Sequence, residues 1–189
     1  MIRNMILLAT LALCIVSCGQ QSTKNESNNV ENDQNQPPML PDKSAFQDTI
    51  NGQATDLYIL KNQQGMTAAI TNYGGRVVSL LVPDKSGELV DVSIGYDNLD
   101  TYVNGSESYF GALIGRYGNR IAGGSFSLDG TAYSLPTNNG PNTLHGGEKG
   151  FQDVVWEVGQ ATPQRLELSY LSEDMEEGFP GNLSVKVVY

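Results

Sequence analysis

The chain has 189 residues, with 11 Lys and Arg against 21 Asp and Glu, so its formal net charge is −10. This balance argues against nucleic acid as the main partner, because phosphate binding needs clustered Lys and Arg. Hydrophobic residues make up 39% and charged residues 17%, which excludes bulk disorder because most of the chain can bury a core.

The N-terminus is predicted to be an export signal. Arg3 is the only charge before a continuous apolar run at residues 5–16. This run is too short to span a bilayer comfortably as a helix, and it is typical of the hydrophobic region of a secretory signal peptide. We therefore expect residues 1–17 to be a signal peptide.

Both cysteines of the chain lie at this end, at Cys14 and Cys18. The segment Ile15-Val16-Ser17-Cys18 resembles the bacterial lipobox, after which the processed protein starts at the lipid-carrying Cys. The sequence thus predicts a lipid on Cys18 and an exported, membrane-anchored bacterial lipoprotein on the periplasmic or outer-membrane face. An ordinary signal peptide with two incidental cysteines is the alternative.

The composition changes sharply after Cys18. Residues 18–44 are rich in Asn, Gln, Ser and Glu and offer almost nothing to bury, and Pro37-Pro38 stiffens their end. Such a composition predicts a disordered polar tether between the lipid and a folded domain. We expect that domain to occupy residues 45–189.

From Ala45 the pattern predicts short strands separated by Gly-rich turns, and no run of helical periodicity follows the signal peptide. The sharpest local signal is Asp129-Gly130, which suits a two-residue hairpin turn because Gly tolerates positive φ. Many short strands of this kind indicate an all-β sandwich or barrel. The expected strands are 55–61, 66–71, 76–82, 89–94, 154–158, 165–170 and 183–189, with a hairpin over 125–135.

The last expected strand has an apolar face made of Leu183, Val185, Val187 and Tyr189, and the chain stops inside it. A strand with an apolar face needs neighbours, so we expect the domain to be truncated at its C-terminus. We also expect that apolar face to lack a partner sheet, which would make it prone to aggregation.

Two Gly-rich loops carry the side chains most suited to chemistry. The loop at 115–124 holds Arg116 and Arg120. It lacks P-loop spacing, so it is either a turn with surface arginines or a rigid set of donors for sugar oxygens. The second loop holds the only His, His145, followed by Gly146-Gly147, which allow a ligand to approach the backbone. A structural role for a lone His remains the alternative.

For the other candidate binding residues, structural roles are favoured. The acidic loop at 173–181 lacks the alternating oxygen ligands of an EF-hand, so a solvated turn is favoured over a calcium site. Tyr109-Phe110 and Trp156 could stack on a sugar, but a core position is favoured. One His and no His/Cys cluster after Cys18 argue against a zinc enzyme or another metal site.

Several distinctive motifs follow one another over residues 45–189. They are Asn72-Tyr73-Gly74-Gly75, Gly115-Arg116-Tyr117-Gly118-Asn119-Arg120-Ile121, the hairpin from Phe126 to Tyr133, Asn142-Thr143-Leu144-His145-Gly146-Gly147, Gly150-Phe151, Trp156 and Glu177-Gly178-Phe179-Pro180-Gly181. Taken in this order, they resemble the aldose 1-epimerase family, also called galactose mutarotases. The family usually has Ala where this chain has Gly118.

The resemblance implies an antiparallel β-supersandwich, present here only in its N-terminal part. It also implies cofactor-free interconversion of the α- and β-anomers of aldohexoses such as glucose and galactose. Asn119, Arg120 and His145 match residues that line the family's sugar pocket. The family's catalytic pair, a second His in its own motif and a Glu, is expected beyond Tyr189, so this chain alone is expected to be inactive.

Two other functions stay open. A non-catalytic carbohydrate-binding lipoprotein of the same fold would hold an aldose without turning it over. A sugar-phosphate epimerase of the same superfamily would need a basic cluster for phosphate, which this acidic chain does not show.

The anchoring hypothesis predicts that Cys18→Ser abolishes lipid labelling and signal-peptide release at that position, because the thiol is the acceptor of the lipid. The measurement is metabolic labelling with a fatty acid followed by mass analysis of the mature N-terminus. Unchanged labelling of the variant would exclude Cys18 as the lipid site.

Overall fold

A computed structural model of the chain describes residues 39–189. The predicted signal peptide, both cysteines and residues 18–38 of the predicted tether lie outside the described residues. The first described element is the 3-10 helix η1 (Lys43–Phe46), where the Asp42 side chain accepts a hydrogen bond from the Ser44 amide at 2.9 Å. Phe46 is fully buried, so ordered structure already includes Lys43 and Ser44, which the sequence places at the end of the tether.

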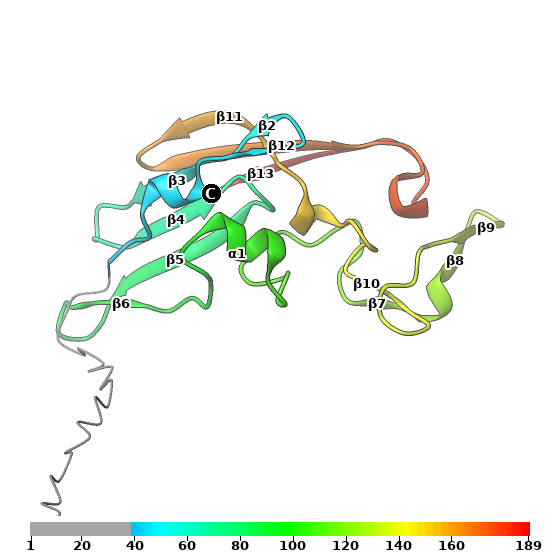
Figure 1. Cartoon of the computed structure of the whole chain (residues 1–189), viewed down its shortest axis with the longest axis horizontal. Coiled ribbons are helices and arrows are strands. Elements are labelled where there is room, and N and C mark those ends of the chain that lie inside the picture. Colours follow the sequence, from blue (N-terminus) through cyan, green and yellow to red (C-terminus); the bar gives the residue numbers. More distant parts are fainter. Residues whose placement is uncertain (1–38) are drawn as a thin grey trace, which may run out of the picture. The chain divides into compact units, whose positions relative to one another are not determined.

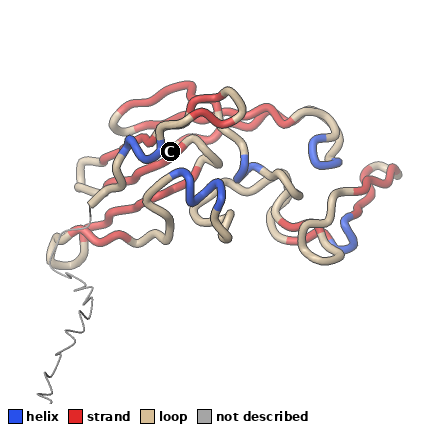
Figure 2. The backbone as a smooth tube through the Cα atoms, viewed as in Figure 1, coloured by secondary structure: helices blue, strands red, loops and turns tan. Residues whose placement is uncertain are grey.

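The all-β antiparallel class is confirmed, and Figure 2 shows strands in red far outnumbering the short helices in blue. The larger sheet pairs its four strands antiparallel in chain order. Apolar residues alternate between its two faces, and both faces are covered, which explains the nearly continuous apolar runs. The strands are β3 (Leu57–Lys61), β4 (Thr67–Thr71), β5 (Arg76–Pro83) and β6 (Leu89–Asp91).

A second, three-stranded sheet packs against one face of the first (Figure 1). The apolar residues between them form the inter-sheet cluster, in which Leu166 and Leu168 of β12 are completely buried. The strands are β11 (Glu157–Thr162), β12 (Arg165–Ser172) and β13 (Leu183–Val188). The cluster consists of Leu60, Ile70, Phe151, Val154, Trp156, Leu166 and Leu168.

The expectation that the last strand lacks a partner for its apolar face is wrong for three of its four residues. Val185, Val187 and Tyr189 pack against the inter-sheet cluster, and the Tyr189 hydroxyl donates to the Gly75 carbonyl oxygen at 2.7 Å. Only Leu183 remains largely exposed, at 41%. The four-stranded sheet supplies the covering surface that sequence alone could not assign.

The opposite face of the four-stranded sheet is covered by η1 and by a helix that the sequence did not predict. This helix, α1 (Leu99–Asn104), is too short to show helical periodicity. The Asn98 side chain caps it by accepting from the Thr101 amide at 2.8 Å. Leu99 and Tyr102, three residues apart, both point into the buried α1-side cluster of Phe46, Leu57, Ala69, Tyr73, Val78, Leu99, Tyr102 and Val155.

Three two-stranded ribbons complete the fold. The predicted hairpin is confirmed: Asp129 and Gly130 have φ of 51° and 80°, as a two-residue turn requires. Residues 154–156, predicted to start a strand, instead lie buried ahead of β11, with Val155 in an isolated bridge to Tyr73. The ribbons are β1 (Thr49–Ile50) with β2 (Gln53–Ala54), β7 (Arg120–Ile121) with β10 (Thr143–Leu144), and β8 (Ser125–Leu128) with β9 (Thr131–Ser134).

The remaining short helices are η2 (Ala122–Gly124), η3 (Phe151–Asp153) and η4 (Glu176–Gly178). Within residues 39–189, no helix has the length and apolar character to cross a membrane.

The packing predicts that Leu168→Ala lowers the free energy of unfolding by about 2–5 kcal/mol, because it removes apolar contacts and leaves a cavity. The matched control is Leu171→Ala on the same strand, where the side chain is 50% exposed and the change should stay within about 0.5 kcal/mol. Urea denaturation measures both. Equal losses would contradict the assignment of the inner face of β12.

Candidate functional site

The β7–β10 ribbon brings together all three predicted site residues, Asn119, Arg120 and His145. Its register pairs Arg120 with Leu144, which places Asn119 and His145 at the same end. The His145 amide donates to the Asn119 carbonyl oxygen at 3.0 Å, and the Asn119 amide donates to the His145 Nδ1 atom at 2.9 Å. Asn119 and His145 have φ of 66° and 53°, a backbone conformation uncommon for residues other than Gly. These reciprocal hydrogen bonds hold both residues in it.

The hydrogen bond to Nδ1 determines what the imidazole offers a ligand. Because Nδ1 accepts a hydrogen bond from an amide, the neutral ring carries its proton on Nε2. Burial lowers the pKa of His145, and the positive charge of Arg120 lowers it further. The His145 ring is therefore held as a neutral donor through Nε2.

The Arg120 guanidinium is anchored beside this ring. Its Nε donates to the Asn139 Oδ1 atom at 2.8 Å, and its Nη1 donates to the Asn119 Oδ1 atom at 3.2 Å. In residues 39–189 its Nη2 has no hydrogen-bond partner, and the side chain is exposed. A guanidinium that is held by two hydrogen bonds and keeps further N–H groups available is suited to binding the oxygen atoms of a ligand.

Glycines let the loop after His145 approach the neighbouring backbone. Gly146 has φ of 100°, and a Cβ there would collide with the Gly115 carbonyl oxygen. Gly147 has φ of 118°, and a Cβ there would collide with the Glu177 carboxylate. That carboxylate accepts a hydrogen bond from the Glu148 amide at 2.7 Å, so the acidic loop is docked onto the His145 loop.

Tyr109, for which the sequence favoured a core position over sugar stacking, is a neighbour of His145. Its ring centroid lies 4.8 Å from that of His145 with an interplanar angle of 60°. Burial raises the pKa of Tyr109, and the negative charge of Asp153 adds to the rise. Phe110 packs against the α1-side cluster and Trp156 is 1% exposed, as predicted. The core prediction is wrong for Tyr109, which belongs to neither buried cluster and lies at the start of a turn closed by the Ala112 amide donating to its carbonyl oxygen at 3.2 Å.

The two arginines of the Gly-rich loop have different positions. The half-buried Arg116 does not join the site but binds the strand–loop junction at the end of β12. Its Nε donates to the Ser172 Oγ atom at 2.7 Å, and its Nη1 and Nη2 donate to the carbonyl oxygens of Pro180 at 3.0 Å and Glu173 at 2.6 Å. The description of both as surface arginines is therefore wrong for Arg116.

The acidic loop is only partly the solvated turn that the sequence favoured. Glu173 and Asp174 are exposed, but Glu176 accepts hydrogen bonds from the Tyr170 hydroxyl and the Ser172 Oγ atom. Burial and the bond to Glu176 raise the pKa of Tyr170. Across residues 39–189, no three His, Cys, Asp or Glu side chains are grouped to hold a metal ion. The carboxylates of Glu176 and Glu177 act as cross-links.

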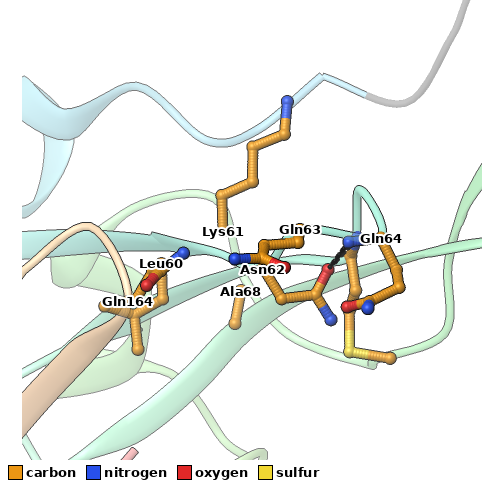
Figure 3. A pocket seen from close by; sticks show the side chains of 8 residues that line it. Leu60, Lys61, Asn62, Gln63, Gln64, Ala68 and Gln164 are labelled. Atoms are coloured by element: carbon orange, nitrogen blue, oxygen red, sulfur yellow. Dashed lines mark hydrogen bonds between the residues drawn. The ribbon is translucent and has the colours of Figure 1, made fainter.

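A separate concavity of about 380 Å³ lies at the β3–β4 turn, away from these residues (Figure 3). Lys61 is the only ionisable side chain that lines it. The Asn62 Oδ1 atom is already occupied, since it accepts from the Gln64 amide at 3.0 Å. The concavity therefore offers no acid–base pair.

The chain is similar in sequence to known proteins. Residues 56–189 match the family model described as aldose 1-epimerase. Galactose mutarotase of Bos taurus is 47% identical over 120 residues, which cover 64% of this chain and 34% of that protein. Galactose mutarotase of Sus scrofa is 41% identical over 148 residues, covering 78% and 42%. The chain thus spans about two fifths or less of the length of these curated relatives.

Solved structures share the fold. The GalM/aldose epimerase homologue from C. elegans superposes with a TM-score of 0.68 at 33% identity, covering 72% of this chain and 42% of that one. Galactose 1-epimerase from Lactobacillus acidophilus NCFM gives a TM-score of 0.65 at 24% identity, covering 75% and 42%.

The site geometry predicts that His145 titrates below 6.5 and that Arg120→Gln raises its pKa, because a like charge is removed. The pKa should stay below 6.5, since the burial remains. NMR titration measures it without ambiguity, because the sequence has one His. The control is Arg165→Gln, where the lost partner is Glu167 and no change is expected. A wild-type pKa of 6.5 or more would contradict the geometry.

Proposed function

Because this chain belongs to the aldose 1-epimerase family, we propose that the protein interconverts the α- and β-anomers of aldohexoses such as glucose and galactose. Relatives named galactose mutarotase and aldose 1-epimerase support this proposal. The reaction moves only protons and one C–O bond, so it requires no cofactor.

The proposal rests on one observation: the side chains of His145 and Arg120 are two hydrogen-bond donors held in place next to each other. His145 presents Nε2–H because Nδ1 accepts the Asn119 amide, and Arg120 presents a guanidinium anchored on Asn119 and Asn139. Both groups donate, and sugar ring and hydroxyl oxygens accept. We assign Asn119, Arg120 and His145 to the sugar-binding wall of the active site.

Anomer interconversion needs an acid and a base on opposite sides of the hemiacetal. The base removes the proton of the anomeric hydroxyl while the acid protonates the ring oxygen. The C1–O5 bond breaks as the C1=O1 carbonyl forms, the C1–C2 bond rotates, and closure reverses the proton movements. The second His and the Glu that the family resemblance implies have no counterpart among these residues. We therefore assign binding and orientation, not proton transfer, to Asn119, Arg120 and His145.

Non-catalytic carbohydrate binding is the second candidate, and the single His of the sequence favours it for the chain taken alone. The donors at His145 and Arg120 would then hold an aldose without ring opening.

We further propose that a lipid on Cys18 attaches the protein to a bacterial membrane, on the periplasmic or outer-membrane face. Cys18 lies outside the described residues.

The site predicts that Arg120→Ala and His145→Ala each weaken galactose or glucose binding about ten- to a hundredfold, because a lost hydrogen bond from a charged or buried polar donor is worth about 1.5–3 kcal/mol. Saturation-transfer NMR with added sugar measures binding. The control is Arg165→Ala, a charge-matched change on β12 that should leave binding intact.

Polarimetry on freshly dissolved α-anomers separates the two candidate functions. Acceleration above the buffer rate that is lost in both variants supports the epimerase, whereas binding without acceleration assigns the chain a binding role. Wild-type affinity in Arg120→Ala and His145→Ala would exclude the proposed sugar wall.

A further inference from the structure

A buried cation is hydrogen-bonded to the backbone on both sides of Tyr109, the residue whose ring contacts His145. Arg76 is the first residue of β5 and is 0% exposed. Its Nη1 donates to the Ser108 carbonyl oxygen at 2.7 Å and to the Phe110 carbonyl oxygen at 3.3 Å. These two carbonyl groups flank Tyr109 on either side in the chain, so the guanidinium holds the backbone from which the Tyr109 ring projects.

The same guanidinium also holds the segment that follows the His145 loop. Its Nη2 donates to the Gln152 carbonyl oxygen at 2.7 Å and lies 3.9 Å from the Asp153 Oδ1 atom. Both residues belong to η3, which follows directly on Gly150. One planar group thus ties the segment that carries the Tyr109 ring to the segment that follows the His145 loop.

The position of the guanidinium is itself closely defined. It lies over the Tyr73 ring at 5.3 Å and over the Tyr102 ring at 4.9 Å, both members of the α1-side cluster. Burial lowers the pKa of Arg76, and Tyr73 and Asp153 oppose that change. Arg remains charged even so, and its planar arrangement of donors matches several fixed carbonyl groups in a way that Lys cannot.

We infer that Arg76 is a positioning residue, which fixes the Tyr109 ring against His145 by holding the carbonyl groups on both sides of Tyr109 and the η3 segment beyond the His145 loop. Within residues 39–189, the hydrogen bonds of Arg76 go to Ser108, Phe110 and Gln152 and not to Asn119, Arg120 or His145, so we expect its effect to pass through Tyr109. The inference deepens the proposed sugar site and rests on it for its functional meaning.

The charged and titratable groups around His145 define what the test must control. Arg120 faces the ring from β7, and Tyr109 faces it from the loop before β7. Glu148 and Lys149 follow it in its own loop. Glu177 docks at Gly147 from the acidic loop, and Asp153 acts on Tyr109 from η3. Arg76→Lys keeps a formally cationic side chain at this position, and it adds or removes none of the groups around His145.

The test is an NMR titration of His145 in the chain without sugar, in wild type, Arg76→Lys, Tyr109→Ala and the double variant. Because the Tyr109 ring contributes to burying His145, we expect both single variants to shift the pKa of His145 upward, toward 6.5. If Arg76 acts through Tyr109, adding Arg76→Lys to Tyr109→Ala causes no further shift. The matched control is Arg165→Lys, which should leave the His145 titration unchanged.

Two outcomes would overturn the inference. One is a wild-type His145 titration in a folded Arg76→Lys variant while Tyr109→Ala shifts it. The other is an additive shift in the double variant, which would show that Arg76 acts independently of Tyr109.

If Arg76→Lys does not fold, nuclear Overhauser spectra of the wild-type chain test the inference instead. Cross-peaks between the Tyr109 and His145 rings, and from the Arg76 guanidinium protons to Ser108 and Phe110, are expected in nuclear Overhauser spectra. Their absence would overturn the inference. Sugar binding is measured separately. If the titrations and cross-peaks are as expected but no sugar binds, the proposed function is refuted and the positioning role of Arg76 still holds.

Discussion

The arrangement of the site depends on the hydrogen bonds of the buried Arg76 guanidinium. A buried charge is expensive unless hydrogen bonds replace its hydration. Three backbone carbonyl oxygens and the faces of two Tyr rings surround it. The carbonyl groups belong to segments that are far apart in the sequence. Binding these carbonyl groups to one cation therefore fixes the relative position of the Tyr109 loop and η3, while the buried Nε atom has no hydrogen-bond partner among the described residues.

Backbone geometry that is unfavourable locally occurs at the site as well as in turns elsewhere. Asn119 and His145 both have positive φ, and Gly146 lies so close to Gly115 that no side chain fits. Such conformations persist only where surrounding contacts determine them. The reciprocal bonds between Asn119 and His145 provide those contacts and at the same time set the imidazole tautomer. Strain and donor orientation thus have the same structural origin.

Charged side chains in this chain divide into cross-links and free donors. Arg116 is saturated by the Ser172–Glu173 segment and Pro180, whereas Arg120 keeps an unpaired terminal nitrogen among the described residues. The two residues lie in one Gly-rich loop, and composition does not distinguish them. Likewise, Glu176 and Glu177 of the acidic loop hold β12 and the His145 loop in place. The rigid surroundings of His145 result from these long-range contacts.

The sequence by itself determined the all-β class, the strands with clear alternation and the Asp129-Gly130 hairpin, because these depend on neighbours within a few residues. Its motifs also marked Asn119, Arg120 and His145 through their resemblance to a family. Only the tertiary structure decided that β13 is covered, that Arg116 leaves the site and that Tyr109 meets His145 in front of a buried Arg76. Local pattern states which face of a segment is apolar, but which distant segment covers that face, and which carbonyl groups a buried cation meets, follows only from how the two sheets pack.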